Sequence, residues 1–487
     1  MLGKLEYKWI VGIVFVFGLF MDLLDMTIVN VAVPQLAQEF KTDTTTIQWV
    51  VTGYLLSLAV FIPVSGWLGD RFGTKRIFLT ALFVFTAASF LCGLAWDIES
   101  LIAFRVLQGI GGGMLTPVGT AMLFRAFPPH ERAKGAAILT IPMVVAPASG
   151  PVLGGYLVEY HDWPWIFFIN VPVGVIAFAF AAIALREEKQ PESGSLDLPG
   201  FLLGCSGLAA LVYALSEAGG RGFDDQQVLV FGGLGILVLA VFAFVELRVA
   251  EPMIDIRLFK NKLFAATNTV QIVGQGGLMG ALFLVPLLLQ AEMGMSPLKS
   301  GLTTFPQAIG VVTMIQVAGR IYPRVGPRRM MMAGMAGATL TTLAFYWVGL
   351  GTSEWWIRLI MYLRGASFSL VLVSLQTATF ATISPREMGR ASALYNSGRQ
   401  VAASFGVAVL ASALENRLSA HDTRLGPPPI GNPVAALDAF HEAFLVAAAL
   451  TLLGIVACFL VSDKDAAPSM HHAPSVPEPE GAPAAVL

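Results

Sequence analysis

The chain has 487 residues, of which 56% are hydrophobic and only 13% are charged, and its mean hydropathy is +0.72. Soluble domains carry about 25% charged residues, so this composition excludes a soluble protein and predicts a polytopic membrane protein. The formal net charge of −2 and the lack of any long Lys/Arg run exclude a nucleic-acid-binding surface.

Fourteen apolar runs are each long enough, at about 20 residues, to cross a membrane as a helix. An even number of spans places both termini on one side. The first run is much longer than a signal-peptide core and lacks a cleavage site, so we expect it to be a retained helix. The runs lie near 9–33, 46–68, 77–96, 99–124, 134–158, 165–185, 198–216, 228–247, 264–290, 301–321, 330–350, 355–380, 390–413 and 440–462.

Lys and Arg are distributed unevenly between the two sets of loops that alternate along these spans. Of the 30 Lys and Arg residues, twenty-one lie in the termini and in the loops on the same side as Arg71. Six lie on the other side, and three lie within spans. Short cytoplasmic loops carry the excess of Lys and Arg. We therefore expect both termini and the loop containing Arg71 to be cytoplasmic.

A basic turn between two apolar runs occurs twice in the chain. Its first copy is GWLGDRFGTKR at 66–76, and its second is GRIYPRVGPRR at 319–329, an offset of 253. A Val-Pro-x-Leu sequence at 33–36 recurs at 285–288, an offset of 252. These repeats indicate that the chain arose by an internal duplication. Transporters built from two such repeats place the substrate near the bilayer midplane, at the interface of the repeats.

The duplication divides the chain into four parts. We expect a six-helix bundle at 1–190, two inserted helices with their linkers at 191–260, and a second six-helix bundle at 261–462. Residues 414–439 form the longest predicted external loop. Residues 463–487 are rich in Pro and Ala, and this composition predicts a disordered cytoplasmic tail.

Five ionisable residues stand out because they lie in the middle of predicted spans, where each costs roughly 2.5–3.5 kcal/mol to insert. They are Asp22, Asp25, Arg105, Arg364 and Arg399. The two aspartates are three residues apart and share one face of a helix. Two nearby carboxylates repel each other when both are ionised, so one of them tends to hold a proton, which suits a proton carrier. The alternative is a structural ion pair between an aspartate and one of the arginines.

The first basic turn resembles the loop signature of the major facilitator superfamily of transporters, which joins the second and third membrane helices on the cytoplasmic side. The resemblance implies an all-α fold with two six-helix, pseudo-symmetric bundles, here with two inserted helices. Asp70 and Arg71 are expected to pair with charges at neighbouring helix ends and to latch one conformational state. The gating residues so assigned are Gly66, Asp70, Arg71, Gly73, Arg76, Gly319 and Arg324.

Three further segments resemble motifs of the fourteen-span drug:proton antiporter family. Residues 24–34 look like its first-helix signature, which implies proton coupling at Asp25. Residues 105–113, RVLQGIGGG, are similar to the fourth-helix motif of the superfamily, in which the arginine is implicated in proton transfer. Segments 163–172 and 396–400 look like its helix-six entry and thirteenth helix. Candidates for substrate contact or coupling are Asn30, Arg364, Asn396 and Arg399.

Residues 146–155, APASGPVLGG, resemble the antiporter motif Gly-x-x-x-Gly-Pro-x-x-Gly-Gly, with Ala146 in place of the first glycine. This motif implies export rather than import. The prolines remove backbone donors and bend the helix, while the glycines let neighbouring helices approach. The residues assigned to it are Pro147, Gly150, Pro151, Gly154 and Gly155.

These patterns together predict a proton-coupled antiporter that exports lipophilic small molecules, cations among them, across the cell membrane by alternating access. An exporter of a lipid, siderophore or other amphipathic metabolite would share every motif. A non-transporting membrane sensor would not need the set formed by Asp22, Asp25 and Arg105.

No nucleophile-base constellation or nucleotide site occurs, so we expect neither an enzyme nor a cofactor, with the proton gradient as the energy source. Cys92, Cys205 and Cys458 lie in apolar runs and are expected to be packing residues rather than metal ligands. The expected partners are the substrate, protons and the lipid bilayer. We expect a monomer, with a periplasmic adaptor if the cell has two membranes.

Overall fold

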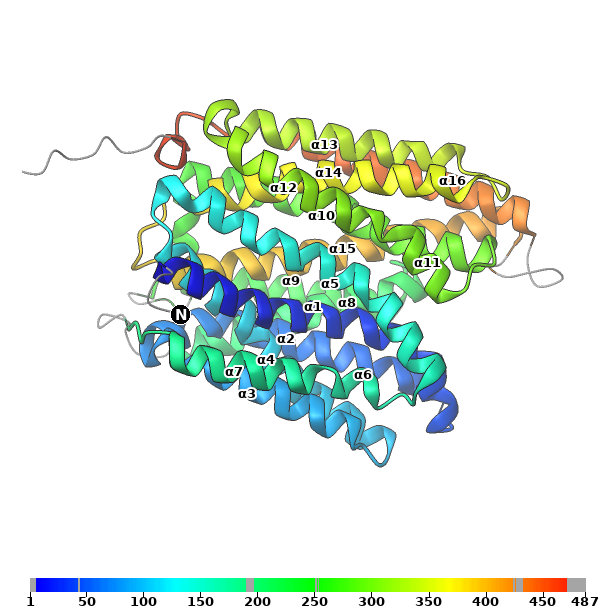
Figure 1. Ribbon diagram of the computed structural model, residues 1–487, viewed down its shortest axis with the longest axis horizontal. Coiled ribbons are helices and arrows are strands. Elements are labelled where there is room, and N and C mark those ends of the chain that lie inside the picture. Colours follow the sequence, from blue (N-terminus) through cyan, green and yellow to red (C-terminus); the bar gives the residue numbers. More distant parts are fainter. Residues whose placement is uncertain are drawn as a thin grey trace, which may run out of the picture.

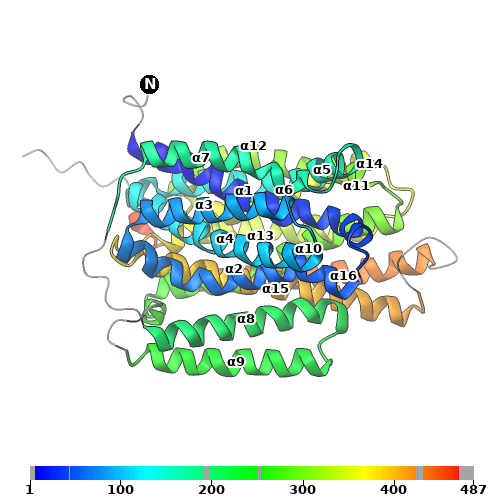
Figure 2. The ribbon, with the colours of Figure 1, turned by 90° about the horizontal axis from the view of Figure 1, so that it is seen from below.

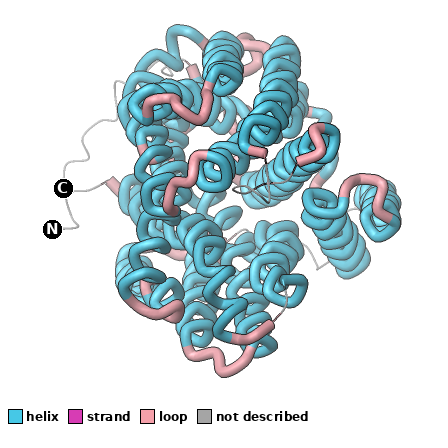
Figure 3. The backbone as a smooth tube through the Cα atoms, turned by 90° about the vertical axis from the view of Figure 1, so that its right-hand side faces the viewer, coloured by secondary structure: helices cyan, strands magenta, loops and turns pink. Residues whose placement is uncertain are grey.

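In the computed structural model, the described residues are 6–42, 44–189, 197–249, 252, 254–423, 425 and 432–470. They form helices and contain no strand, which confirms the all-α prediction. The helices run side by side along the long axis of the molecule (Figure 1), and Figure 3 looks along them.

The two halves of the duplication each supply one group of helices. The first group consists of α1 (Tyr7–Glu39), α2 (Thr44–Phe72), α3 (Thr74–Gly93), α4 (Ile98–Ala126), α5 (Arg132–Tyr160), α6 (Trp165–Phe168) and α7 (Asn170–Ala184). The second consists of α10 (Lys262–Leu287), α11 (Pro297–Thr304), α12 (Pro306–Val325), α13 (Pro327–Ala344), α14 (Glu354–Thr379), α15 (Met388–Ala420) and α16 (Pro433–Ala457). Between them lie α8 (Leu198–Arg221) and α9 (Gln226–Glu246).

Twelve helices among the described residues are long and apolar enough to cross a membrane. This confirms a polytopic membrane protein. α5 and α13 are not among the twelve: α5 offers only the shorter apolar stretch Val145–Val158, and α13 has Arg328 and Arg329 in its first turn and three threonines further along. The count of fourteen spans therefore stays a prediction, as does the side of the membrane on which the termini lie.

Helix contacts repeat between the two halves. α4 packs on α2 and α3, and α1 packs on α5; likewise α14 packs on α12 and α13, and α10 packs on α15. The turn between α2 and α3 contains Gly73 with a φ of 104°, and the turn between α12 and α13 contains Gly326 with a φ of 85°. Glycine adopts such positive φ values without steric cost. The backbone of the basic turn is thus duplicated along with its sequence.

The halves meet along two seams. One seam is formed by α2 with α15, and the other by α5 with α11 and α12. The inserted helix α8 packs on both α2 and α15, and α9 packs on α8 (Figure 2). The Cys205 thiol of α8 donates a hydrogen bond to the Val60 carbonyl of α2 at 2.9 Å, and the Ser412 hydroxyl of α15 donates to the Ala218 carbonyl of α8 at 2.6 Å. α8 is therefore bonded to both halves across one seam.

Two segments differ from the sequence-based expectation. The predicted external loop 414–439 is shorter, because α15 continues to Ala420 with Leu414 and Leu418 buried, and α16 already begins at Pro433. The first part of the predicted disordered tail is ordered. Residues 463–470 include a turn in which the Ser469 hydroxyl is buried and bonded to the Tyr322 hydroxyl at 2.9 Å. Residues 471–487 lie outside the described residues.

Both ends of the described chain lie at the same end of the bundle as the Gly73 and Gly326 turns (Figure 1), and we call it the basic end. The halves are joined there by hydrogen bonds. The Arg125 side chain of α4 donates to the Pro385 carbonyl at 3.0 Å, and the Ser392 hydroxyl of α15 donates to the Pro117 carbonyl at 2.7 Å.

Arg132 of α5 adds bonds to the Phe380 and Ile383 carbonyls of the second half, and the rings of Phe124 and Phe380 stack at 4.6 Å. The basic end is closed by direct contact between the halves.

Gly66 and its repeat counterpart Gly319 form a matched pair for testing this closure. A Cβ on Gly66 would lie 2.5 Å from the backbone oxygen of Gly389 in the other half, whereas a Cβ on Gly319 would meet no atom within 4 Å. We expect Gly66→Ala to open the basic end and Gly319→Ala to leave it unchanged.

The measurement is the maleimide labelling rate of a Ser392→Cys reporter in a protein without the three native cysteines. Labelling should be several-fold faster with Gly66→Ala than with the native glycine. Equal rates in the two glycine variants would contradict the assigned contact.

Candidate functional site

Asp25 lies in the interior of the first half, and its side chain is 0% exposed. Its carboxylate accepts three hydrogen bonds, which come from Arg105 Nη1 at 2.5 Å, Gln108 Nε2 at 2.9 Å and Asn170 Nδ2 at 3.0 Å. A buried charge is tolerated when it is paired and fully hydrogen-bonded. For Asp25 the structure therefore has the ion pair that was the alternative to a shared proton.

Two helices supply the donors to this carboxylate, and a third, α3, joins the network through Asn170. α4 presents Arg105 and Gln108 one turn apart on one face, and α7 begins with Asn170. The Asn170 amide also donates to the Ser89 hydroxyl of α3 at 3.1 Å, and that hydroxyl donates to the Phe167 carbonyl at 2.9 Å. The network fixes α1 against α3, α4 and α7.

The Arg105 guanidinium has partners beyond Asp25. Its Nε donates to the Val50 carbonyl of α2 at 3.0 Å, and its Nη1 donates to Gln108 Oε1 at 2.7 Å. The guanidinium also lies over the Tyr54 ring, 4.2 Å from the ring centroid. A cation over an aromatic face gains about 2 kcal/mol when it is desolvated. Arg105 is thus held by α1, α2 and its own helix.

Asp22, one turn before Asp25 on α1, has a separate set of partners. The Tyr54 hydroxyl donates to its Oδ1, and the Thr116 hydroxyl donates to its Oδ2 at 3.2 Å. A Cβ on Gly112 would lie 2.7 Å from Asp22 Oδ1 and 2.8 Å from the Tyr54 oxygen. The glycine in this part of α4 therefore makes room for the Asp22 bonds.

The two aspartates and Arg105 are brought together, and Arg399 of the second half interacts electrostatically with Asp22, but Arg364 and Asn396 are not part of this cluster. Arg364 donates to the Thr342 hydroxyl and the Leu278 carbonyl, both at 2.9 Å, and has no carboxylate within ion-pair distance among the described residues. Asn396 donates to the Ser392 carbonyl of its own helix at 2.9 Å.

The side chains of Asn30 and Pro151 lie outside the described residues.

Among the predicted gating residues, Asp70 lies in a buried ion pair. Arg125 Nη2 lies 2.5 Å from Asp70 Oδ1, and each side chain is 5% exposed. Desolvation of two buried charges offsets much of their attraction, but removing one partner leaves the other charge uncompensated, which typically costs about 3–5 kcal/mol. Arg71, Arg76 and Arg324 are exposed at the basic end.

The antiporter-like segment of α5 packs against α1 at one of its glycines. A Cβ on Gly150 would lie 2.1 Å from Thr27 Oγ1 and 3.2 Å from the Ile28 nitrogen. Thr27 follows Asp25 by two residues in the sequence. A Cβ on Gly155 would have ordinary contacts, the nearest at 3.8 Å to the Leu298 nitrogen of α11. Gly150 sets the approach of the two helices, whereas Gly155 has room for a side chain.

Sequence reasoning did not assign several members of the cluster. Gln108 and Asn170 lie inside the quoted motifs, and the spacing of Gln108 from Arg105 would place both on one helix face. Tyr54, Ser89 and Thr116 belong to no motif, and their ordinary polar chemistry gives no signal that distinguishes them from other residues of the spans.

Comparison with known families identifies the scaffold. The profile described as Major Facilitator Superfamily matches residues 15–407. The chain belongs to the major facilitator superfamily. It is a transporter rather than an enzyme, and a multi-pass protein of the cell membrane.

Similar proteins include ones named for multidrug resistance. The multidrug resistance protein B homolog of Mycobacterium tuberculosis (strain ATCC 25618 / H37Rv) is 36% identical over 397 residues, which cover 80% of this chain and 73% of that protein. The putative multidrug resistance protein MdtD of Serratia proteamaculans (strain 568) is 33% identical over 401 residues, which cover 82% of this chain and 83% of that protein.

The crystal structure of the human organic anion transporter MFSD10 (TETRAN) superimposes on the transporter with a TM-score of 0.63 and 16% identity. The match covers 93% of this chain and 99% of that one. At this identity the likeness concerns the fold alone. It confirms the major facilitator architecture.

The two motif glycines offer a matched test of the α1–α5 packing. Gly150→Ala should destabilise the transporter by about 1–3 kcal/mol, the usual cost of overpacking a well-packed interior. Gly155→Ala should leave its stability within about 0.5 kcal/mol. The measurement is the unfolding midpoint of the two purified variants in the same detergent. A larger loss for Gly155→Ala than for Gly150→Ala would contradict the packing described here.

Proposed function

We propose that this transporter is a proton-coupled antiporter that exports lipophilic small molecules by alternating access between its two halves. The observation that carries the proposal is the pair of interior carboxylates on α1, with Asp25 held by Arg105. An ionisable residue inside a membrane is costly and serves transport or proton relay by default. Similarity to proteins named for multidrug resistance supports drug-like substrates.

In this proposal Asp25 is the proton carrier. Arg105, Gln108 and Asn170 all donate hydrogen bonds to its carboxylate, and each of these bonds is made to a carboxylate oxygen. Protonation then requires the loss of at least the Arg105 contact. All three donors belong to the same half as Asp25, so rocking of the halves as rigid bodies does not separate them. Release therefore needs α1 to shift against α4 within the half.

Asp22 responds to a different movement. Its hydrogen-bond partners also lie in the first half, but Arg399 of α15 is close enough for the two charges to interact. Opening of the halves changes that separation. We propose that Asp22 senses the rocking motion and tunes the proton affinity of Asp25, its neighbour on α1. A single chain supplies every residue of this relay, so a monomer suffices.

Substitution of each aspartate by its amide tests the assignment. We expect Asp25→Asn to abolish transport driven by a pH gradient while substrate binding remains measurable, because the amide keeps the shape of the side chain but cannot carry the proton. The assay uses proteoliposomes with an imposed pH gradient and two dyes built on one xanthene ring, cationic rhodamine 6G and anionic fluorescein.

Asp162→Asn, at an exposed position, is the control. Near wild-type accumulation of a dye by Asp25→Asn would overturn the carrier role. Loss of coupling in Asp22→Asn alone would transfer that role to Asp22. Gradient-independent movement of both dyes by the wild-type protein would contradict proton coupling itself.

A further inference from the structure

Three arginines lie within predicted spans, and Arg399 is the one that has no direct partner among the described residues. Its side chain is only half-buried, and it has no hydrogen bond or ion pair among the described residues. The other two arginines within predicted spans differ in this respect. Arg105 is paired with Asp25, and Arg364 is bonded to Thr342 and Leu278.

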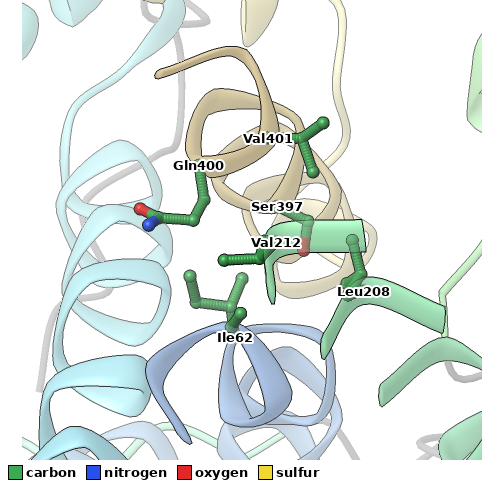
Figure 4. Close-up of a pocket in the computed structure, with 7 residues that line it drawn as sticks. Ile62, Leu208, Val212, Ser397, Gln400 and Val401 are labelled. Carbon is green, nitrogen blue, oxygen red and sulfur yellow. The ribbon is translucent and has the colours of Figure 1, made fainter. Parts of the chain in front are cut away.

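The position of Arg399 on α15 shows which way it faces. Figure 4 shows Ser397, Gln400 and Val401 of the same helix beside α2 and α8, where they line a small crevice with Leu208 and Val212. Successive helix residues are about 100° apart, so Arg399 projects nearly opposite to Ser397. It therefore points away from α8 and from the lipid beyond it.

Its neighbours confirm that it faces the interior. Arg399 interacts electrostatically with Asp22 of α1, whose side chain is buried, and with Tyr395 one turn earlier, also buried. At the adjacent Gly398, a Cβ would lie 3.8 Å from the Gln271 amide of α10. Arg399 thus faces the first half, and part of its side chain stays accessible there.

The N–H donors of Arg399 have no hydrogen-bond acceptor among the residues that the structure describes. The Asp22 carboxylate interacts with the charge of Arg399, but its two oxygens already accept hydrogen bonds from Tyr54 and Thr116. A guanidinium presents five N–H donors in a planar fork that matches the two oxygens of a carboxylate, sulfonate or phosphate. An unpaired charge inside the membrane is costly, so an acidic ligand that meets this fork would relieve that cost.

We propose that Arg399 binds the acidic group of the substrate, so that lipophilic organic acids are a substrate class of this transporter. The proposal rests on the function proposed above and names the chemistry of its substrate. Arg399 then serves as the specificity-determining residue of the second half. A cationic substrate gains nothing from this contact and is repelled by it.

Binding of the two xanthene dyes tests the proposal independently of transport. Equilibrium binding is measured by fluorescence polarisation on the purified transporter at constant pH, with no gradient. We expect Arg399→Gln to weaken fluorescein binding by about tenfold or more, since a hydrogen bond to a charged group contributes about 1.5–3 kcal/mol. Rhodamine 6G binding should not weaken and should become tighter, because the variant removes a like charge that repels this cation.

Two further variants complete the comparison. Arg399→Lys keeps the charge and should retain part of the fluorescein affinity, because an ammonium lacks the planar fork. Arg417→Gln is the matched control, since Arg417 lies on the same helix with 54% of its side chain exposed. It should bind both dyes as the wild-type protein does.

A measurement on the wild-type protein keeps the proposal testable if Arg399→Gln does not fold. Wild-type transporter should bind fluorescein more tightly than its methyl ester, in which the carboxylate is blocked. Equal weakening of both dyes in Arg399→Gln would show a general conformational role and overturn the proposal. So would unchanged fluorescein binding in that variant, or equal wild-type affinity for the acid and its ester.

Failure of gradient-driven dye transport, with these binding differences intact, would instead contradict the proposed antiport.

Discussion

The cost of burying charge away from water is the constraint on which this structure depends. Asp25 and Arg105 have almost no exposed surface, and they are tolerated because each is surrounded by complementary groups. Removing one member of such a pair leaves the other uncompensated, which typically costs 3–5 kcal/mol. The surrounding glutamine, asparagine, serine and tyrosine therefore do more than fill space. They link α1, α3, α4 and α7, four of the helices of the first half.

Within the first half the helices are joined by buried polar bonds, whereas the contacts between the halves are of a different kind. At the basic end they are hydrogen bonds to backbone carbonyls, such as that from Arg125 to Pro385, together with stacked rings. These contacts can be exchanged for water when that end opens, because they lie at the edge of the bundle. The Asp70–Arg125 pair lies within the first half, so it can persist through the movement while its link to the second half is broken.

The sequence predicted the helical fold and the duplication because both rest on patterns that survive in one dimension, namely apolar runs and a repeated turn. It brought Asp22, Asp25 and Arg105 to notice because charges are rare in apolar runs. It did not predict their division into two separate networks. That division depends on Tyr54 and Asn170, which reach α1 from other helices, and on Gly112, whose lack of a side chain leaves space for them. Such arrangements are set by packing in three dimensions.

The position of α8 makes the two seams unlike each other. Through Cys205 and Ser412, α8 is bonded to α2 and to α15, and α9 covers it from outside. A hydrophobic molecule dissolved in the lipid would meet this double wall at one seam, whereas at the other it would meet α5, α11 and α12 directly. Pseudo-symmetry between the halves thus does not extend to the approaches from the bilayer. The insertion covers one flank of the transporter and leaves the other uncovered. The two flanks therefore differ for a molecule that moves within the plane of the membrane.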